Sequence, residues 1–254
     1  MRWQLPLGTA LVTGGTSGIG RATAVALARA DLRVVLLTRH GDEAEKVAQE
    51  IGGNVCGIEG DVSDERSVAE AIDRTCSGLG GLRYVANCAG VHQSADFWKV
   101  TPADWNEMVN VNLVGAFNVA RAARPYLQSA SGASIVNVSS IEASRVVALV
   151  NQAAVPHYAA AKGGLEMLTK SLAHELARDN IRVNAVAPGP VATRLTASDH
   201  ESAGHLPARF ADHMLIRRYA APSEIADVVC FLLSPASSFV TATTVCVDGG
   251  YSAL

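Results

Sequence analysis

The sequence has no apolar run long enough to cross a membrane and no cluster of basic residues. A membrane-spanning helix needs about 18 or more consecutive apolar residues, and no run among these 254 residues approaches that length. The 21 Lys and Arg are scattered along the chain, and with 24 Asp and Glu they leave a net charge of −3. A membrane-spanning protein and a nucleic-acid-binding protein are therefore disfavoured.

Cysteine pairs and metal-ligand spacings are also missing. The five cysteines are odd in number, lie in apolar stretches and are never two residues apart, so we expect small buried hydrophobic side chains in a reducing compartment. They are Cys56, Cys76, Cys88, Cys230 and Cys246. His200 and His205 are five residues apart, whereas zinc-binding helices need a spacing of four, so we expect no metal site.

The N-terminal segment carries Arg2, but its apolar run passes directly into a glycine turn without a cleavage-like site. We therefore expect no signal peptide and a cytoplasmic protein.

Short β-branched runs alternate with longer amphipathic stretches along the whole chain. The expected strands are residues 10–12, 33–37, 54–59, 84–87, 134–138, 181–187 and 243–247. The expected helices are residues 19–30, 42–51, 64–76, 102–110, 113–127, 157–178 and 222–233. This alternation predicts one doubly wound α/β domain of Rossmann type over residues 1–254, with a seven-stranded parallel sheet and helices on both faces.

A glycine-rich turn follows the first expected strand and leads straight into a helix. Its glycines, Gly14, Gly18 and Gly20, follow the order G-x-x-x-G-x-G. Glycine lets the backbone turn tightly and approach a pyrophosphate, which rests on the N-terminus of the next helix. Dinucleotide-binding candidates in this turn are Gly14, Thr16, Ser17, Gly18, Ile19 and Gly20; the alternative is a turn that needs glycine only for packing.

The second expected strand ends near Thr38 and Arg39, with no acidic residue before Asp42. An acid here typically binds the ribose 2′-hydroxyl of NAD, whereas an Arg accommodates the 2′-phosphate of NADP. The sequence therefore favours NADP(H), with NAD(H) as the alternative. The other interpretation of Arg39 is a solvated loop residue.

Tyr158 and Lys162 are four residues apart, so they share one face of a helix. A fixed cation beside a phenol favours the phenolate and lowers its pKa. Such a tyrosine acts as a general acid or base towards a carbonyl or an alcohol. The alternative is a surface Lys beside a half-buried Tyr.

Taken together, these residues resemble the short-chain dehydrogenase/reductase family over residues 9–251, with the motifs in the family's order. The resemblance adds cofactor contacts at Asp61, Val62, Asn87, Ala89, Gly90, Pro188, Gly189, Val191 and Thr193, besides Tyr158 and Lys162. Two departures are Ser17, where NADP-dependent members often have a basic residue, and Cys88, which replaces an Asn. Residues 247–250 match the C-terminal signature.

The resemblance also implies the catalytic residues Asn112, Ser140, Tyr158 and Lys162. Tyr158 exchanges the proton, Lys162 tunes Tyr158 and binds the nicotinamide ribose, Ser140 polarises the substrate oxygen, and Asn112 holds a water. Ser140 lies further from Tyr158 than the family usually places it, which makes Ser144 a rival. We favour Ser140 because the end of the fifth expected strand determines its position.

Substrate contacts are expected from an apolar stretch at residues 146–155, which could instead cover a neighbouring subunit. Residues 194–221 form a long connection typical of a substrate lid. Candidate wall residues are His92, Phe97, Trp98, Leu195, Met214 and Leu215.

These features favour an NADP(H)-dependent carbonyl or 3-oxoacyl reductase acting on a small molecule. The alternatives are an NAD-dependent alcohol, sugar or steroid dehydrogenase, and a dinucleotide-binding regulator without turnover. The resemblance further implies a homotetramer or homodimer, built through the helices at residues 113–127 and 157–178.

Overall fold

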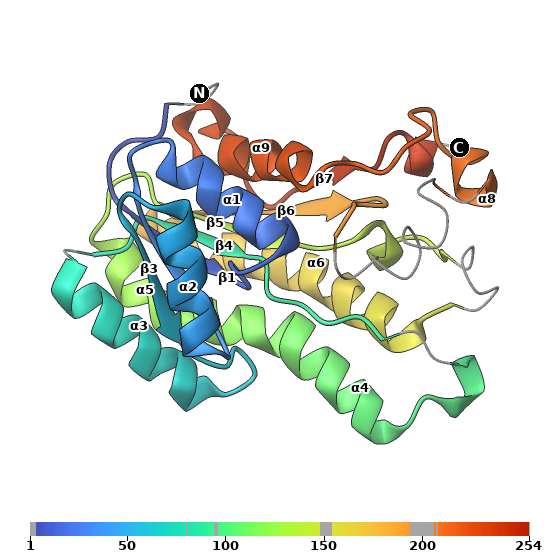
Figure 1. Ribbon diagram of the computed structural model, residues 1–254, viewed down its shortest axis with the longest axis horizontal. Coiled ribbons are helices and arrows are strands. Elements are labelled where there is room, and N and C mark those ends of the chain that lie inside the picture. The colour runs from blue at the N-terminus through green and yellow to red at the C-terminus, as the bar shows by residue number, and fades with distance from the viewer. Residues whose placement is uncertain are drawn as a thin grey trace.

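The computed structural model describes residues 4–79, 81–93, 96–147, 154–193, 206 and 208–253. Seven parallel strands form one sheet in the order β3-β2-β1-β4-β5-β6-β7 (Figure 1). They are β1 (Thr9–Thr13), β2 (Arg33–Thr38), β3 (Val55–Glu59), β4 (Tyr84–Asn87), β5 (Ser134–Val138), β6 (Arg182–Pro188) and β7 (Thr244–Val247). The predicted fold class is confirmed.

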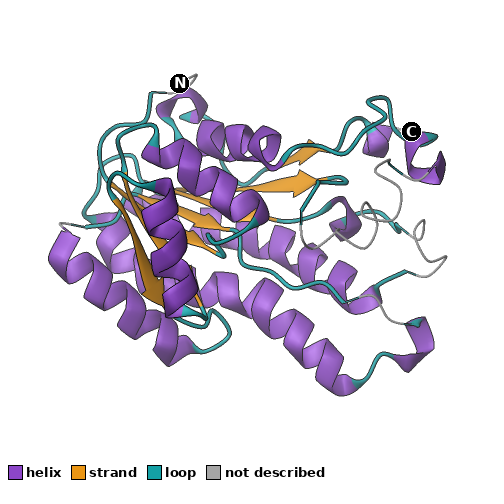
Figure 2. Cartoon of the chain, in the orientation of Figure 1, coloured by secondary structure: helices purple, strands orange, loops and turns teal. Residues whose placement is uncertain are grey.

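Helices cover both faces of the sheet (Figure 2). One face packs against α1 (Gly18–Ala28), α2 (Gly41–Ile51) and α9 (Pro222–Leu233). The other packs against α3 (Glu65–Leu79), α5 (Gly115–Gln128) and α6 (Pro156–Leu176). Because β1, β4 and β5 are buried along their whole length, they are mostly apolar in sequence and do not alternate between apolar and polar residues.

Two expected helices are one continuous helical segment in the structure. The first, α4 (Pro102–Val109), runs into α5 through a π-helical turn, Asn110–Val114. Inside this turn the Asn112 side-chain amide donates hydrogen bonds to the carbonyls of Val91, at 2.9 Å, and Met108, at 3.1 Å. π-turns are often found at functional sites, and this one brings Asn112 inward.

The order of the strands reverses between β1 and β4, which are neighbours in the sheet. The Thr13 hydroxyl, at the end of β1, accepts hydrogen bonds from the amides of Cys88, at 3.1 Å, and Ala89, at 3.0 Å. The loops after the two strands are thus tied together at their carboxyl ends. Ligands of doubly wound sheets bind at such a switch point.

The cysteine prediction holds for only part of the set. Cys76 and Cys230 are buried and Cys88 is half-buried, but Cys56 and Cys246 are exposed on the outer strands β3 and β7. The prediction was wrong for these two because an edge strand can leave a small apolar side chain in contact with water. All five thiols are free. No helix in the described part of the chain is long and apolar enough to cross a membrane.

Candidate active site

A cavity of about 1290 Å³ follows the carboxyl edge of the sheet, from Arg39 after β2 to Ser140 and Tyr158. It exceeds the roughly 300–1,000 Å³ of most small-ligand pockets, so it can take a dinucleotide together with a second molecule. The predicted site residues that line it are Gly14, Thr16, Ser17, Gly18, Ile19, Gly20, Arg39, Asp61, Val62, Ala89, Gly90, Asn112, Ser140, Tyr158, Lys162, Pro188, Gly189, Val191 and Thr193.

Asn87 is the exception among the predicted site residues. It is buried in β4, and its side-chain amide donates a 2.8 Å hydrogen bond to Asn137 on β5. The Asn137 amide in turn donates to the Thr169 hydroxyl on α6 at 2.9 Å. Asn87 therefore lies behind the cavity wall, where it joins β4, β5 and α6.

The glycine turn is packed too tightly for any side chain at two positions. A Cβ on Gly14, whose φ is +63°, would lie 2.9 Å from the Ala89 Cα. A Cβ on Gly20 would lie 2.3 Å from the Gly14 carbonyl oxygen. The Ser17 side chain does not cap α1, and the first turn of α1 contains no acidic residue. The helix N-terminus therefore faces the cavity with amides that suit a pyrophosphate.

The far end of the cavity is formed by Thr38, Arg39, His40 and Glu43. Arg39 is exposed and forms no ion pair or hydrogen bond with any residue that the structure describes. Its guanidinium is free to meet an anionic group, and a planar guanidinium fits a phosphate well.

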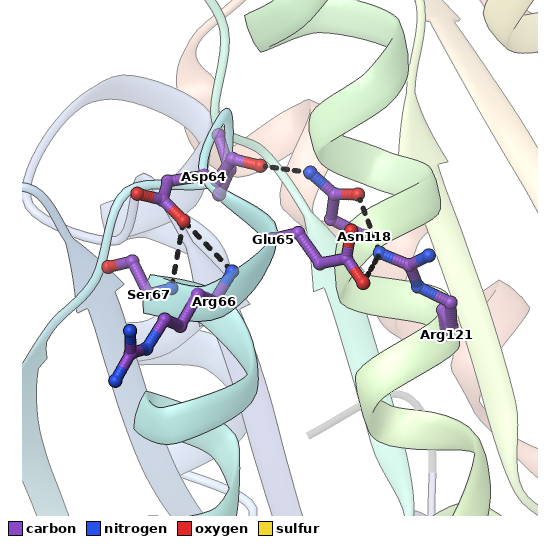
Figure 3. A network of polar contacts seen from close by, with 7 residues as sticks. Asp64, Glu65, Arg66, Ser67, Asn118 and Arg121 are labelled. Atoms are coloured by element: carbon purple, nitrogen blue, oxygen red, sulfur yellow. Dashed lines mark hydrogen bonds and ion pairs between the residues drawn. The ribbon is translucent and has the colours of Figure 1, made fainter.

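A polar network holds the wall formed by Asp61 and Val62 (Figure 3). The Asn118 amide, on α5, donates a 3.0 Å hydrogen bond to the Val62 carbonyl. Arg121 on α5 pairs with Glu65 on α3 at 2.7 Å. Helix α5 thus contacts both the loop after β3 and the start of α3. These contacts hold the segment after β3, which lines the cavity, in place.

Tyr158 and Lys162 lie one turn apart at the start of α6, which begins with Pro156. Both side chains are buried, and the Lys162 Nζ lies 5.6 Å from the centre of the Tyr158 ring. Nζ also donates a 2.8 Å hydrogen bond to the Val138 carbonyl at the end of β5. The Lys162 side chain is therefore held in place beside the ring.

Burial controls the protonation of this pair. It raises the pKa of the Tyr158 phenol well above its ordinary value; the charge of Glu142 raises that pKa further, and a hydrogen bond with Ser140 partly offsets the rise. Burial lowers the pKa of Lys162 to about 8. We predicted that the Lys162 cation would lower the pKa of Tyr158; among the chain's own groups desolvation prevails, and the net shift is upward.

Ser140 follows β5 and begins a short 3-10 turn, Ile141–Ala143. Its hydroxyl accepts a 3.2 Å hydrogen bond from the Glu142 amide and is hydrogen-bonded to Tyr158. Ser144 comes after the turn and does not line the cavity. The structure therefore brings Ser140, and not its rival Ser144, to Tyr158.

Asn112 and Lys162 both lie next to Gly90. A Cβ on Gly90 would lie 2.8 Å from the Asn112 Oδ1 and 3.6 Å from the Lys162 Nζ. Asn112 is 2% exposed, and its Oδ1 has no hydrogen-bond partner in the part of the chain that the structure describes. A buried acceptor of this kind is costly unless a donor reaches it, so the arrangement fits a hydrogen-bond relay to Lys162.

The substrate end was predicted only in part. His92, Phe97 and Trp98 line it as expected, and the His92 ring lies 4.8 Å from that of Tyr158, edge to face. Met214 and Leu215 do not line it, and Leu195 lies outside the described residues. Sequence reasoning missed part of the lining, namely Val91, Glu142, Phe210 and Tyr219.

The connection at residues 194–221 contributes two of these residues. Phe210 comes from the short helix α8 (Ala208–Ala211), and its ring lies 6.1 Å from that of Tyr251 in the C-terminal segment beside it (Figure 1). Tyr219 lies next to Ala220, which pairs with Val191. Of the apolar stretch at residues 146–155, Val147, Ala154 and Val155 line the cavity, whereas residues 148–153 lie outside the described part.

No three His, Cys, Asp or Glu side chains are grouped to hold a metal ion within the described ranges. His200 and His205 fall outside those ranges.

Residues 14–252 match the protein family described as Enoyl-(Acyl carrier protein) reductase. The chain is 35% identical over 247 residues to a 3-oxoacyl-[acyl-carrier-protein] reductase of Thermotoga maritima, which covers 94% of this chain and 96% of the relative. It is 36% identical over 248 residues to a cis-4-hydroxycyclohexanecarboxylate dehydrogenase of Sinomonas cyclohexanicum, with 96% of each chain covered.

Among solved structures, one similar protein is a gluconate 5-dehydrogenase from Burkholderia cenocepacia in complex with NADP and tartrate. Its TM-score is 0.89 at 30% identity, over 97% of this chain and 95% of the other. The relatives are similar over nearly their full length, and they share the fold that carries the cavity. This chain therefore belongs to the short-chain dehydrogenase/reductase family of NAD(P)-dependent oxidoreductases, which act on CH–OH and carbonyl groups.

Proposed function

We propose that this protein is an NADP(H)-dependent carbonyl reductase, of the carbonyl or 3-oxoacyl reductase type. One observation carries the proposal: Ser140, Tyr158, Lys162 and Asn112 meet at one end of a cavity whose other end presents Arg39. A proton-transfer group and a phosphate-binding group thus lie at the two ends of a space that suits a dinucleotide.

The proposed chemistry divides between cofactor and protein. When bound, the nicotinamide would supply the hydride to the carbonyl carbon. Tyr158 donates the proton to the carbonyl oxygen, and its phenol is protonated at neutral pH in the free protein. Ser140 donates a hydrogen bond to the same oxygen and polarises the carbonyl.

Lys162 and Asn112 complete the proposed site. Lys162 binds the nicotinamide ribose, and its pKa of about 8 allows it to pass a proton near neutral pH. The unpaired Oδ1 of Asn112 supports a relay from Lys162 towards solvent. The pyrophosphate is assigned to the N-terminus of α1, and the adenine end to Asp61 and Val62.

A second candidate function is dehydrogenation in the oxidising direction with NAD. It is favoured by the similarity to the Sinomonas cyclohexanicum dehydrogenase. In that direction Tyr158 would accept the alcohol proton as the base.

The direct test is oxidation of NADPH and of NADH by the purified protein against pooled carbonyl compounds. The pools should span acetoacetyl esters, ketosteroids, keto sugars, quinones and aliphatic ketones. We expect turnover with NADPH in at least one pool. If neither NADPH nor NADH is oxidised with any pool, but NAD⁺ is reduced with alcohols, the result would favour the dehydrogenase instead.

Arg39→Ala tests the cofactor assignment. Removing the guanidinium should raise the KM for NADPH about tenfold or more, since a charge-assisted contact is worth roughly 1.5–3 kcal/mol, and leave the KM for NADH nearly unchanged. Arg29→Ala is the matched control, because Arg29 ends α1 and does not line the cavity. An Arg39→Ala protein that keeps its NADPH preference would refute the assignment.

We also propose that the protein is a homotetramer or homodimer assembled through α5 and α6. Phe117 on α5 is 41% exposed and Met167 on α6 is 60% exposed, which leaves apolar side chains for a second copy to cover. Size-exclusion chromatography giving the mass of a single chain would reject this.

A further inference from the structure

A carboxyl group stands at the substrate end of the cavity, and the proposed chemistry does not use it. Glu142 lies in the 3-10 turn that follows Ser140 and lines the cavity. Its own amide donates to the Ser140 hydroxyl at 3.2 Å. The backbone of Glu142 is therefore tied to Ser140, the residue that would polarise the substrate carbonyl.

The Glu142 carboxyl has no hydrogen-bond or ion-pair partner among the described residues. The described ionisable groups that face Glu142 are Tyr158 and Tyr251, and the charge of Glu142 raises the pKa of both. Arg145 does not pair with Glu142 but donates a hydrogen bond to the Ser252 carbonyl. An unpaired acid in a cleft costs stability and often marks a functional site.

Burial raises the pKa of Glu142 to about 7. The carboxyl group is thus partly protonated at neutral pH. A substrate hydroxyl suits both forms, because it donates to the carboxylate and can also accept from the protonated acid.

Apolar side chains lie near the two tyrosines that face Glu142. Val91 and Val155 pack in one cluster with Tyr158, and Phe210 lies beside Tyr251; all three apolar residues line the cavity. The cationic side chains among the described lining residues are remote or engaged: Arg39 lies at the other end, and Lys162 donates to the Val138 carbonyl. Glu142 would therefore repel an anionic substituent of a substrate, with no described cation beside it to offset the charge. A neutral hydrogen-bond donor on the substrate would instead find an acceptor in the Glu142 carboxyl group.

We propose that Glu142 is a specificity-determining residue that binds a hydroxyl group on the carbon next to the substrate carbonyl. The preferred substrates are then neutral hydroxy ketones, and ketones with a carboxylate at that place are disfavoured. This inference rests on the proposed carbonyl reduction and names the substrate class for the same site.

The test uses pairs of ketones that differ by one group. Two pairs compare ketones of similar size without and with the hydroxyl group: butanone with hydroxyacetone, and cyclohexanone with hydroxycyclohexanone. Methyl acetoacetate and the acetoacetate anion compare a neutral group with a charged one. We expect the wild-type protein to favour each hydroxy ketone by about tenfold in kcat/KM, the value of one buried hydrogen bond, and the ester over the anion.

Two variants separate charge from hydrogen bonding. Glu142→Leu should abolish the preference for hydroxy ketones, so that the two ketones of each pair have similar kcat/KM. The ratio within a pair is the readout, because Glu142 also acts on the pKa of Tyr158 and its loss changes both rates together. Glu142→Gln, which is isosteric and neutral, should retain part of that preference and gain turnover of the acetoacetate anion. Glu166→Gln is the matched control: this half-buried carboxylate bonds to the Ser139 hydroxyl at 3.3 Å and does not line the cavity.

The outcomes distinguish this inference from the proposed function. Turnover of pooled carbonyl compounds without any preference for hydroxy ketones, or a preference that survives in Glu142→Leu, would overturn the role of Glu142 alone. No turnover of any pair or pool with either cofactor would reject carbonyl reduction itself, and the role of Glu142 with it.

Discussion

Tyr158→Phe is expected to lower kcat about a thousandfold, within the range of 10² to 10⁴ that proton transfer by a positioned side chain contributes. The phenol is the proton donor in the proposed reduction, and the variant removes only its oxygen. The ring should stay packed beside His92, because that edge-to-face contact does not involve the hydroxyl. NADPH affinity should therefore remain almost unchanged.

Stopped-flow hydride transfer and a fluorescence titration with NADPH would separate the two effects. Ser144→Ala is the control, since Ser144 does not line the cavity, and it should keep wild-type activity. Ser140→Ala should instead lose activity because Ser140 is hydrogen-bonded to Tyr158. Strong residual turnover in Tyr158→Phe would contradict the proton-transfer role.

Gly57→Ala is expected to destabilise the whole nucleotide half of the sheet. Gly57 lies in β3, and an added Cβ would be 2.4 Å from the Ala44 carbonyl carbon and 2.5 Å from the Glu45 amide nitrogen. These are backbone atoms of α2, so the helix must move away from the sheet. We expect a loss of about 3 kcal/mol, as for overpacking elsewhere, and a Tm lower by roughly 6–12 °C.

The same displacement should weaken NADPH binding, because α2 begins two residues after Arg39. Thermal unfolding followed by circular dichroism, together with the NADPH titration, measures both consequences. Gly53→Asn provides the control in the same α2–β3 connection: its φ is +67°, which Asn tolerates, and nothing lies within 4 Å. A Gly57→Ala protein with wild-type Tm would show that β3 and α2 are packed less tightly than the structure indicates.

Local sequence patterns were sufficient for the order and type of the strands and helices. Strands buried on both faces are read as continuous apolar runs, and the helices between them have their own amphipathic period. Boundaries moved by a few residues, as at β6 and α6. The joining of α4 to α5 was missed because the π-turn depends on Asn112 reaching the Val91 carbonyl, a contact 21 residues away.

The candidate site likewise contains residues that local sequence patterns indicated and residues that only tertiary contacts placed. The glycine turn, Arg39 and the Tyr158–Lys162 pair line one cavity as the sequence led us to expect, because each depends on spacing over a few residues or on the end of a strand. Asn87, predicted as a cofactor contact, lies behind the cavity wall, since the pairing of β4 with β5 brings it to Asn137. Phe210 and Tyr219 belong to a long connection whose contacts no local pattern predicts.

What the sequence by itself determined is the parallel α/β fold and the set of candidate groups for dinucleotide binding and proton transfer, because these follow from periodicity and short-range spacing. Only the tertiary structure decided how those groups ionise and which of them meet. Burial beneath segments distant in the chain raises the pKa of Tyr158 and of Glu142, and the turn after β5 brings Ser140 rather than Ser144 to the phenol. Desolvation and long-range contacts depend on the packed arrangement, which no single stretch of sequence contains.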